Sequence, residues 1–146
     1  MNTVNQRNVT RNQSTADYEV KRIFIFDNRF ENGTYLNNDA EDNITLEAGM
    51  LVARNTSVAG GLIPVTSSNL ANVIGIAAYE GSIELAPTET AVTAYATKGT
   101  IDGNKLVLPA TITLNTTVGS KSLRDVLEGL GFHIDTSSVE HTKFDN

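Results

Sequence analysis

Short apolar runs separated by glycine turns constrain the fold of this chain more than any other feature of its sequence. The runs recur roughly every 8 to 12 residues and are rich in the β-branched side chains that favour strands. This spacing predicts a mainly β fold, a small barrel or sandwich of short strands. The expected strands are 18–26, 44–55 with a break at Gly49, 60–68, 72–81, 91–101, 104–114 and 132–135.

The first expected strand and the turn after it form a clear local pattern. Residues 18–26 carry aromatic and β-branched side chains, and the continuous apolar run 23–26 predicts burial on both faces. Asn32 and Gly33 follow, with an aromatic residue close on either side. Because asparagine and glycine both tolerate positive φ angles, this dipeptide predicts a tight β-hairpin turn.

One helix interrupts the β pattern towards the end of the chain. The residues that recur at spacings of three and four are Leu123, Val126, Leu127 and Leu130. Such spacing places them on one face of a helix. Ser122, with an acidic residue three positions later, predicts an N-terminal cap, and Gly129 or Gly131 can end the helix. We expect this helix to close one side of the barrel.

The first 17 residues differ from the rest of the chain. Val4 and Val9 are their only sizeable aliphatic side chains after the first methionine, so the segment cannot bury enough apolar area to offset its ordering entropy. Arg7 and Arg11 face a single acid and give a slightly basic balance. The sequence divides into a flexible N-terminal arm at 1–17, a β-rich domain at 18–135 and a polar C-terminal tail at 136–146.

Composition and charge exclude several classes of function. The chain has no cysteine, which removes disulfides, thiolate nucleophiles, iron–sulfur clusters and zinc–thiolate sites. Its formal net charge of -6 opposes attraction to phosphates, so no nucleic acid partner is expected. No apolar stretch approaches the roughly 18 residues of a membrane span, and no signal peptide is evident. We expect a protein with no membrane partner that is used without export.

A search for reactive groups finds no enzyme signature. His133 lies in the last expected strand and His141 in the tail, and His133 is more simply a strand residue facing solvent or a subunit boundary. Asp39, Glu41 and Asp42 cluster in a polar loop without the spacing of an EF-hand, which indicates a solvated loop. The sequence therefore predicts no enzyme, no catalytic residue, no cofactor and no metal site.

Several of these patterns, in this order, resemble the lambda protein D-like family of head decoration proteins of tailed bacteriophages. The similar segments are Leu-x-x-Gly at 46–49, Ile-Gly-Ile at 74–76, a strand with Lys-Gly-Thr at 93–100, an apolar run ending at proline at 106–109, the helix at 123–130 and the closing strand at 132–134. The resemblance spans about residues 45–135. The segment 18–43 and the tail are additions to the family pattern.

The resemblance implies a β-tulip-like barrel that forms a homotrimer on the outer surface of the capsid, in a virion assembled in the host cytoplasm. There it would bind the major capsid protein and stabilise the head, with no reaction involved. In that family the N-terminal segment becomes ordered on the capsid. The implied capsid-binding residues of the arm are Val4, Arg7, Val9, Arg11 and Tyr18.

Small side chains indicate where copies of the chain would meet. Alanine, threonine and glycine dominate 91–100 and 73–81, which permits close backbone approach either at a barrel corner or at a three-fold boundary. The candidate apolar residues of the trimer interface are Leu62, Ile63, Val65 and Tyr79.

Two other functions fit the same sequence. The domain could form the shoulder of a trimeric head fibre, with its arm or tail bound to a further virion protein. It could instead be a small carbohydrate-binding module. In that case the oxygen-rich loop and four tyrosines would form the site, namely Tyr18, Tyr35, Tyr79 and Tyr95.

Overall fold

The structure is a computed structural model that describes residues 23–136. Over these residues it is mainly β with one α-helix, as the sequence predicts, and the strands close into a barrel. The elements are β1 (Phe24–Leu36), β2 (Ile44–Glu47), β3 (Leu51–Asn55), β4 (Gly61–Pro64), η1 (Leu70–Asn72), β5 (Val73–Ala77), β6 (Ser82–Leu85), β7 (Thr90–Asp102), η2 (Gly103–Lys105), β8 (Thr117–Val118), β9 (Lys121–Ser122), α2 (Leu123–Leu130) and β10 (Phe132–Asp135). The predicted arm at 1–17 and the tail beyond residue 136 lie outside the described residues.

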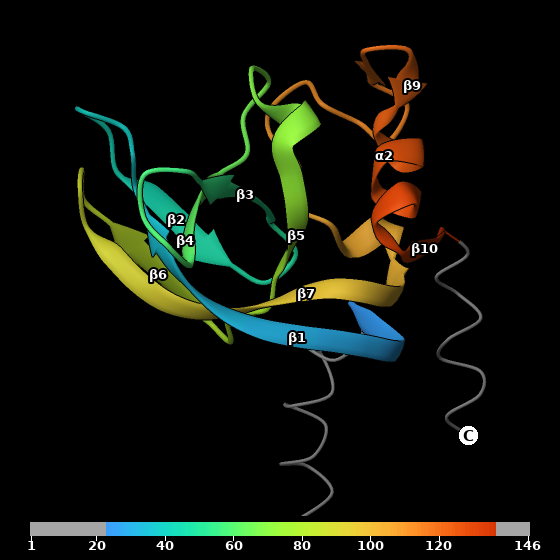
Figure 1. Cartoon of the computed structure of the whole chain (residues 1–146), viewed down its shortest axis with the longest axis horizontal. Coiled ribbons are helices and arrows are strands. Elements are labelled where there is room, and N and C mark those ends of the chain that lie inside the picture. The colour runs from blue at the N-terminus through green and yellow to red at the C-terminus, as the bar shows by residue number, and fades with distance from the viewer. Residues whose placement is uncertain (1–22, 137–146) are drawn as a thin grey trace, which may run out of the picture.

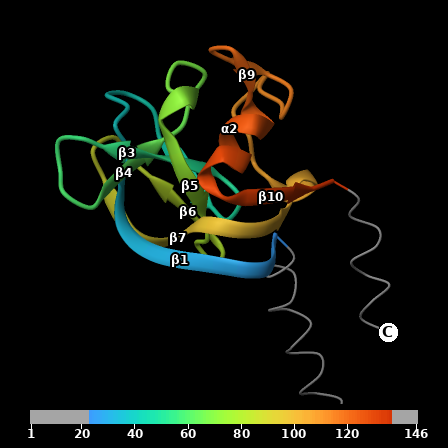
Figure 2. The same ribbon diagram turned by 45° about the vertical axis from the view of Figure 1, so that its right-hand side comes forward.

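The barrel closes because β1 has a partner on each side. Along the sheet the order is β1, β4, β3, β5 and β7, and β7 pairs again with β1. The antiparallel β1–β7 pairing runs from Phe24 to Leu36, whereas β1 meets β4 in parallel at Thr34 and Tyr35. Figures 1 and 2 show β1 and β7 as a long curved pair that runs beneath β3, β4 and β5.

The helix and the last strand confirm two predictions. The Ser122 hydroxyl accepts the backbone N–H of Asp125 at 3.2 Å, and Gly131 ends α2 with a φ of 115°. β10 then adds to β7 in parallel, with Phe132 opposite Gly99. In Figures 1 and 2, α2 lies beside β5 on the same side of the β1–β7 pair, so it covers one side of the barrel strands as expected.

Hydrophobic clusters cover both faces of the central strands. One cluster joins α2 and β10 to β3, β5 and β7, and its fully buried members include Ile76, Ile101 and Leu127. The other contains Tyr35 and Leu62 and receives further side chains from the β2–β6 pair. Adjacent residues of β3 point into different clusters because side chains alternate along a strand.

The predicted hairpin at Asn32 and Gly33 is wrong. Both residues lie inside β1 and pair with β7 in regular antiparallel register. A Cβ atom at Gly33 would lie 2.7 Å from Cδ1 of Leu62, so the absence of a side chain lets β1 approach β4. The dipeptide therefore serves a close approach between strands and not a turn.

Two other strand predictions need correction. The expected strand 104–114 is absent. Val107 makes one isolated bridge, with Met50, and Leu106 and Leu108 pack onto the α2 cluster after the η2 turn. The run at 23–26 is not buried on both faces, since Phe26 is 60% exposed. In addition, the structure contains β6, β8 and β9, which the sequence reading did not predict.

Candidate interaction surface

The longest unpaired strand edge among the described residues belongs to β1. One side of β1 pairs with β7 along its length, but on the other side only Thr34 and Tyr35 pair, with Gly61 and Leu62 of β4. We call the unpaired side of residues 24–33 the open edge. Its backbone N–H and C=O groups can bond to another extended segment.

The open edge carries exposed aromatic side chains. Phe26 is 60% and Phe30 is 47% exposed, and the Phe30 ring meets the Phe24 ring edge-on with centroids 5.2 Å apart. Pairing with β7 is irregular from Phe24 to Phe30, where Asp27 has a φ of 52°, and regular from Phe30 onward. After Asp27 no further non-glycine residue of β1 has a positive φ, so residues 28–33 are the part of the open edge best shaped to accept a strand.

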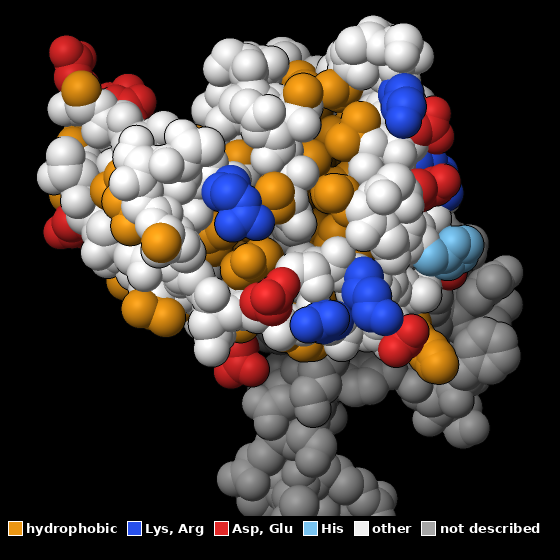
Figure 3. Space-filling view, in the orientation of Figure 1, with side chains coloured by type: hydrophobic (Ala, Val, Ile, Leu, Met, Phe, Trp, Pro, Cys, Tyr) orange, Lys and Arg blue, Asp and Glu red, His pale blue; other side chains and the backbone are white. Residues whose placement is uncertain are grey.

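An apolar hollow lies beside the open edge. Figure 3 shows hydrophobic side chains gathered in a depression between β5 and α2. Half-buried side chains that pack on the α2 cluster include Phe24, Ile63, Leu106 and Val126. Contiguous apolar surface of this kind is typical of contacts between proteins.

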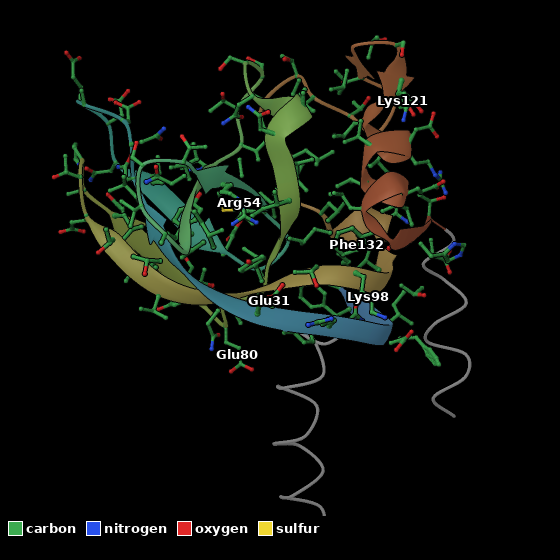
Figure 4. The ribbon with its side chains drawn as sticks, in the orientation of Figure 1. Glu31, Arg54, Glu80, Lys98, Lys121 and Phe132 are labelled. Carbon is green, nitrogen blue, oxygen red and sulfur yellow. The ribbon has the colours of Figure 1, made fainter. Side chains whose placement is uncertain are left out.

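Charged side chains border the hollow. In the same orientation, Figure 4 places Arg54 on one side of it and Glu31 and Lys98 below it, on β1 and β7. All three side chains are exposed, whereas Phe132 beside α2 is buried. An apolar centre with a rim of both charges is the usual composition of a protein interface.

The structure corrects half of the predicted trimer interface. Leu62 and Val65 are buried inside the two clusters, so neither offers apolar area to a second copy. Ile63 and Tyr79 are half-buried at the margins of the clusters, and their role at an interface stays a prediction. The predicted capsid-binding residues Val4, Arg7, Val9, Arg11 and Tyr18 lie outside the described residues.

The acidic loop and the described histidine lie at the surface. His133 is exposed on β10, as expected for a strand residue that faces solvent. The Asp39 carboxylate accepts the backbone N–H groups of Asp42 at 3.0 Å and Glu41 at 2.8 Å, which lowers the pKa of Asp39. Within residues 23–136, no three His, Asp or Glu side chains gather in a way that could hold a metal ion.

Sequence reasoning missed the exposed aromatic side chains of β1. Phe26 ends the apolar run 23–26, which the period of a strand alone assigns to a core, and Phe30 flanks the hairpin turn that the sequence predicts. The charges at Asp27, Arg29 and Glu31 were the available signal, because charged residues along a strand are typical of an edge that faces solvent.

No protein-family model matches the chain, and no curated protein matches its sequence. Between residues 23 and 136, none of the helices has the length and apolar character needed to cross a bilayer. The partner of the open edge and the apolar hollow is therefore inferred from the chemistry of their side chains and from the order of the strands.

Proposed function

We propose that this protein decorates the head of a tailed bacteriophage, where it binds the outer surface of the capsid as a trimer and stabilises it. Its partners are the major capsid protein and further copies of itself. The observation that carries the proposal is that segments of the resemblance, far apart in sequence, meet at β7. β5 pairs with β7 through Ile76 and Ala96, β10 pairs with it through Phe132 and Gly99, and α2 packs against both.

The distribution of charge supports an arm that binds a protein shell. Residues 1–17 carry two basic side chains and one acidic side chain, whereas residues 23–136 carry six basic and thirteen acidic ones. Strand addition uses backbone hydrogen bonds, which an arm rich in asparagine and threonine can supply. Ordering one arm costs about 2–5 kcal/mol. Three arms on one trimer raise the strength of attachment by about 10² to 10⁴.

The carbohydrate-binding alternative is disfavoured by the position of its tyrosines. Tyr35 and Tyr95 are buried in the hydrophobic cluster that faces the β2–β6 pair, so neither can stack on a sugar. The head-fibre alternative shares the trimer and the arm with the decoration protein and stays a prediction.

Deleting residues 2–17 tests the proposal. Folding and the trimer should persist, but occupancy of purified capsids should fall at least about tenfold because the multivalent contact is lost. Light scattering measures the trimer, and quantitative gels of washed capsids measure occupancy. Deleting residues 137–146 is the control and should leave occupancy near that of the full chain. A protein that is a monomer in solution and does not bind mature capsids, with or without the arm, would refute the proposal.

A further inference from the structure

The open edge of β1 is a second possible binding surface, separate from the arm. Arg29, Phe30, Glu31 and Asn32 are all exposed, and no described strand pairs with them on the side away from β7. β4 occupies the same side further along, in parallel with β1 at Thr34 and Tyr35. A second parallel segment placed before β4 would complete this side of the strand.

We propose that residues 18–22 of one copy add as a parallel strand to residues 28–32 of β1 in a neighbouring copy. This inference rests on the trimer of the proposed function and names the contact that builds it. The segment has strand-forming residues, and it directly precedes the first described residue, Ile23.

The length of the chain makes this pairing possible between copies and not within one. Parallel strands need a connection of about a dozen residues or more. Only residues 23–27 separate the two segments, and Phe24 and Phe26 are already paired with Ile101 and Thr100 of β7. The Ile23 carbonyl also accepts the backbone N–H of Asp102 at 2.8 Å, which ties the end of the segment to β7.

One parallel register matches both charge and hydrophobicity. With an offset of ten residues, Glu19 lies opposite Arg29 and Lys21 lies opposite Glu31, so each pair has opposite charges. Val20 then lies opposite the half-exposed Phe30 ring. Every pair in this register is favourable or neutral.

A parallel contact between different segments is heterologous, and such contacts close into rings when the rotation between copies fits. Three copies joined this way would each give residues 18–22 to the next copy and receive the same segment from the previous one. Residues 1–17 would remain free to bind the capsid.

Engineered cysteines test the register without interference, because the chain has no cysteine of its own. Adjacent strands lie about 4.8 Å apart, which suits a disulfide. We expect the full chain with Arg22→Cys and Asn32→Cys to form covalent trimers on mild oxidation, visible on a non-reducing gel. Mixing the two single variants, one of them tagged, should give a linked dimer that contains both.

Control pairs separate the other arrangements. Arg22→Cys with Ser120→Cys, an exposed site in the turn between β8 and β9, should not link. Arg22→Cys with Phe26→Cys would link in an antiparallel, two-fold arrangement, and that result would overturn the parallel register. A disulfide formed within a single copy would overturn the inference and leave the proposed function standing. So would a trimer, seen by light scattering, in which no disulfide forms between copies. Linked trimers that do not bind capsids would overturn the proposed function and leave the inference standing.

A charge exchange provides an independent measurement. Lys21→Glu and Glu31→Lys should each raise the concentration at which trimers dissociate at least about threefold, because each places like charges opposite one another. The double variant should restore the original value. Two single effects that simply add in the double variant would contradict the pairing.

Discussion

β1 and β7 are both 13 residues long and pair with each other, but they differ in what lies on their second side. β7 has β5 beside Tyr95 and Ala96 and β10 beside its last residues. β1 has β4 at Thr34 and Tyr35 and no described strand along 24–33. Equal length and shared pairing therefore do not make two strands equivalent. One strand joins the parts of the fold, and the other has backbone groups along 24–33 that no described strand pairs with.

The side chains of the two strands explain this difference. β7 is rich in small residues, and Gly99, with a φ of 126°, lets Asn28 of β1 lie directly against its backbone. Gly75 of β5 lies equally close to the Ala96 carbonyl of β7. β1 instead carries charges through its irregular part, and charged side chains keep an unpaired edge soluble.

The largest effect should come from a fully buried residue of β7. Ile101→Ala removes side-chain atoms from the cluster shared with α2 and leaves a cavity, so the free energy of unfolding should fall by about 2–5 kcal/mol. Urea denaturation followed by circular dichroism measures it. Val92→Ala is the matched control, because Val92 is in the same strand and is 70% exposed; it should cost less than about 0.5 kcal/mol. Equal losses would contradict the contrast within β7.

The next effect tests the close approach of β5 to β7. A Cβ atom at Gly75 would lie 2.8 Å from Cδ2 of Tyr95 and against the Ala96 carbonyl, so Gly75→Ala should lower the free energy of unfolding by about 1–3 kcal/mol. Gly129→Ala is the control, because nothing lies within 4 Å of the new atom and alanine favours helix; it should gain about 0.5–1 kcal/mol. A neutral Gly75→Ala would mean that β5 can move away from β7 at no cost.

Local signals predicted the elements whose ends are marked in the sequence. Ser122 and Gly131 bracket α2, and Gly49, with a φ of 96°, separates β2 from β3 as expected. The same reasoning failed at Gly33, because a glycine can serve a turn or a close approach and only Leu62, distant in sequence, distinguishes them. Buried Asn37 shows where the chain does leave β1: its side-chain amide donates to the Asp42 and Leu85 carbonyls at 2.9 and 3.0 Å.

The candidate surface was harder to predict, because exposure depends on which elements fail to cover a strand. An apolar run such as 23–26 has the same pattern whether or not another element packs on it. The prediction that Leu62 and Val65 lie at an interface failed in the opposite direction. The local sequence does not show that two hydrophobic clusters enclose these side chains. The charged residues along β1 indicated its exposed edge, whereas the hydrophobic periodicity of the sequence did not.

A smaller effect should come from the other end of β1, where Tyr35 is fully buried and its hydroxyl has no hydrogen-bond partner among the described residues. Tyr35→Phe removes a polar group that folding separates from water, so it should gain about 1 kcal/mol at pH 7. Burial raises the pKa of the Tyr35 hydroxyl above its ordinary 10.0. As the pH rises above 10, the hydroxyl therefore ionises in the unfolded chain before it ionises in the folded one, and the free energy of unfolding of the parent chain falls.

The advantage of Tyr35→Phe over the parent chain should accordingly grow above pH 10, as measured by urea denaturation at pH 7, 9 and 11. Tyr79→Phe is the matched control, because Tyr79 is only half-buried, so it should show no gain at pH 7. A loss of stability in Tyr35→Phe would mean that the hydroxyl has a partner, such as a buried water.

The smallest effect on stability should come from the start of the open edge. Phe26→Ser should change the free energy of unfolding by less than about 0.5 kcal/mol, because the side chain is 60% exposed and covers little of either cluster. Phe24→Ser, two residues earlier, is the control and should cost more than about 1 kcal/mol, since Phe24 packs on the α2 cluster opposite Ile101. Thermal melts at equal concentration compare them. Equal losses would show that Phe26 supports the fold, whereas the expected contrast leaves an exposed aromatic residue that folding does not require and that an interface can use.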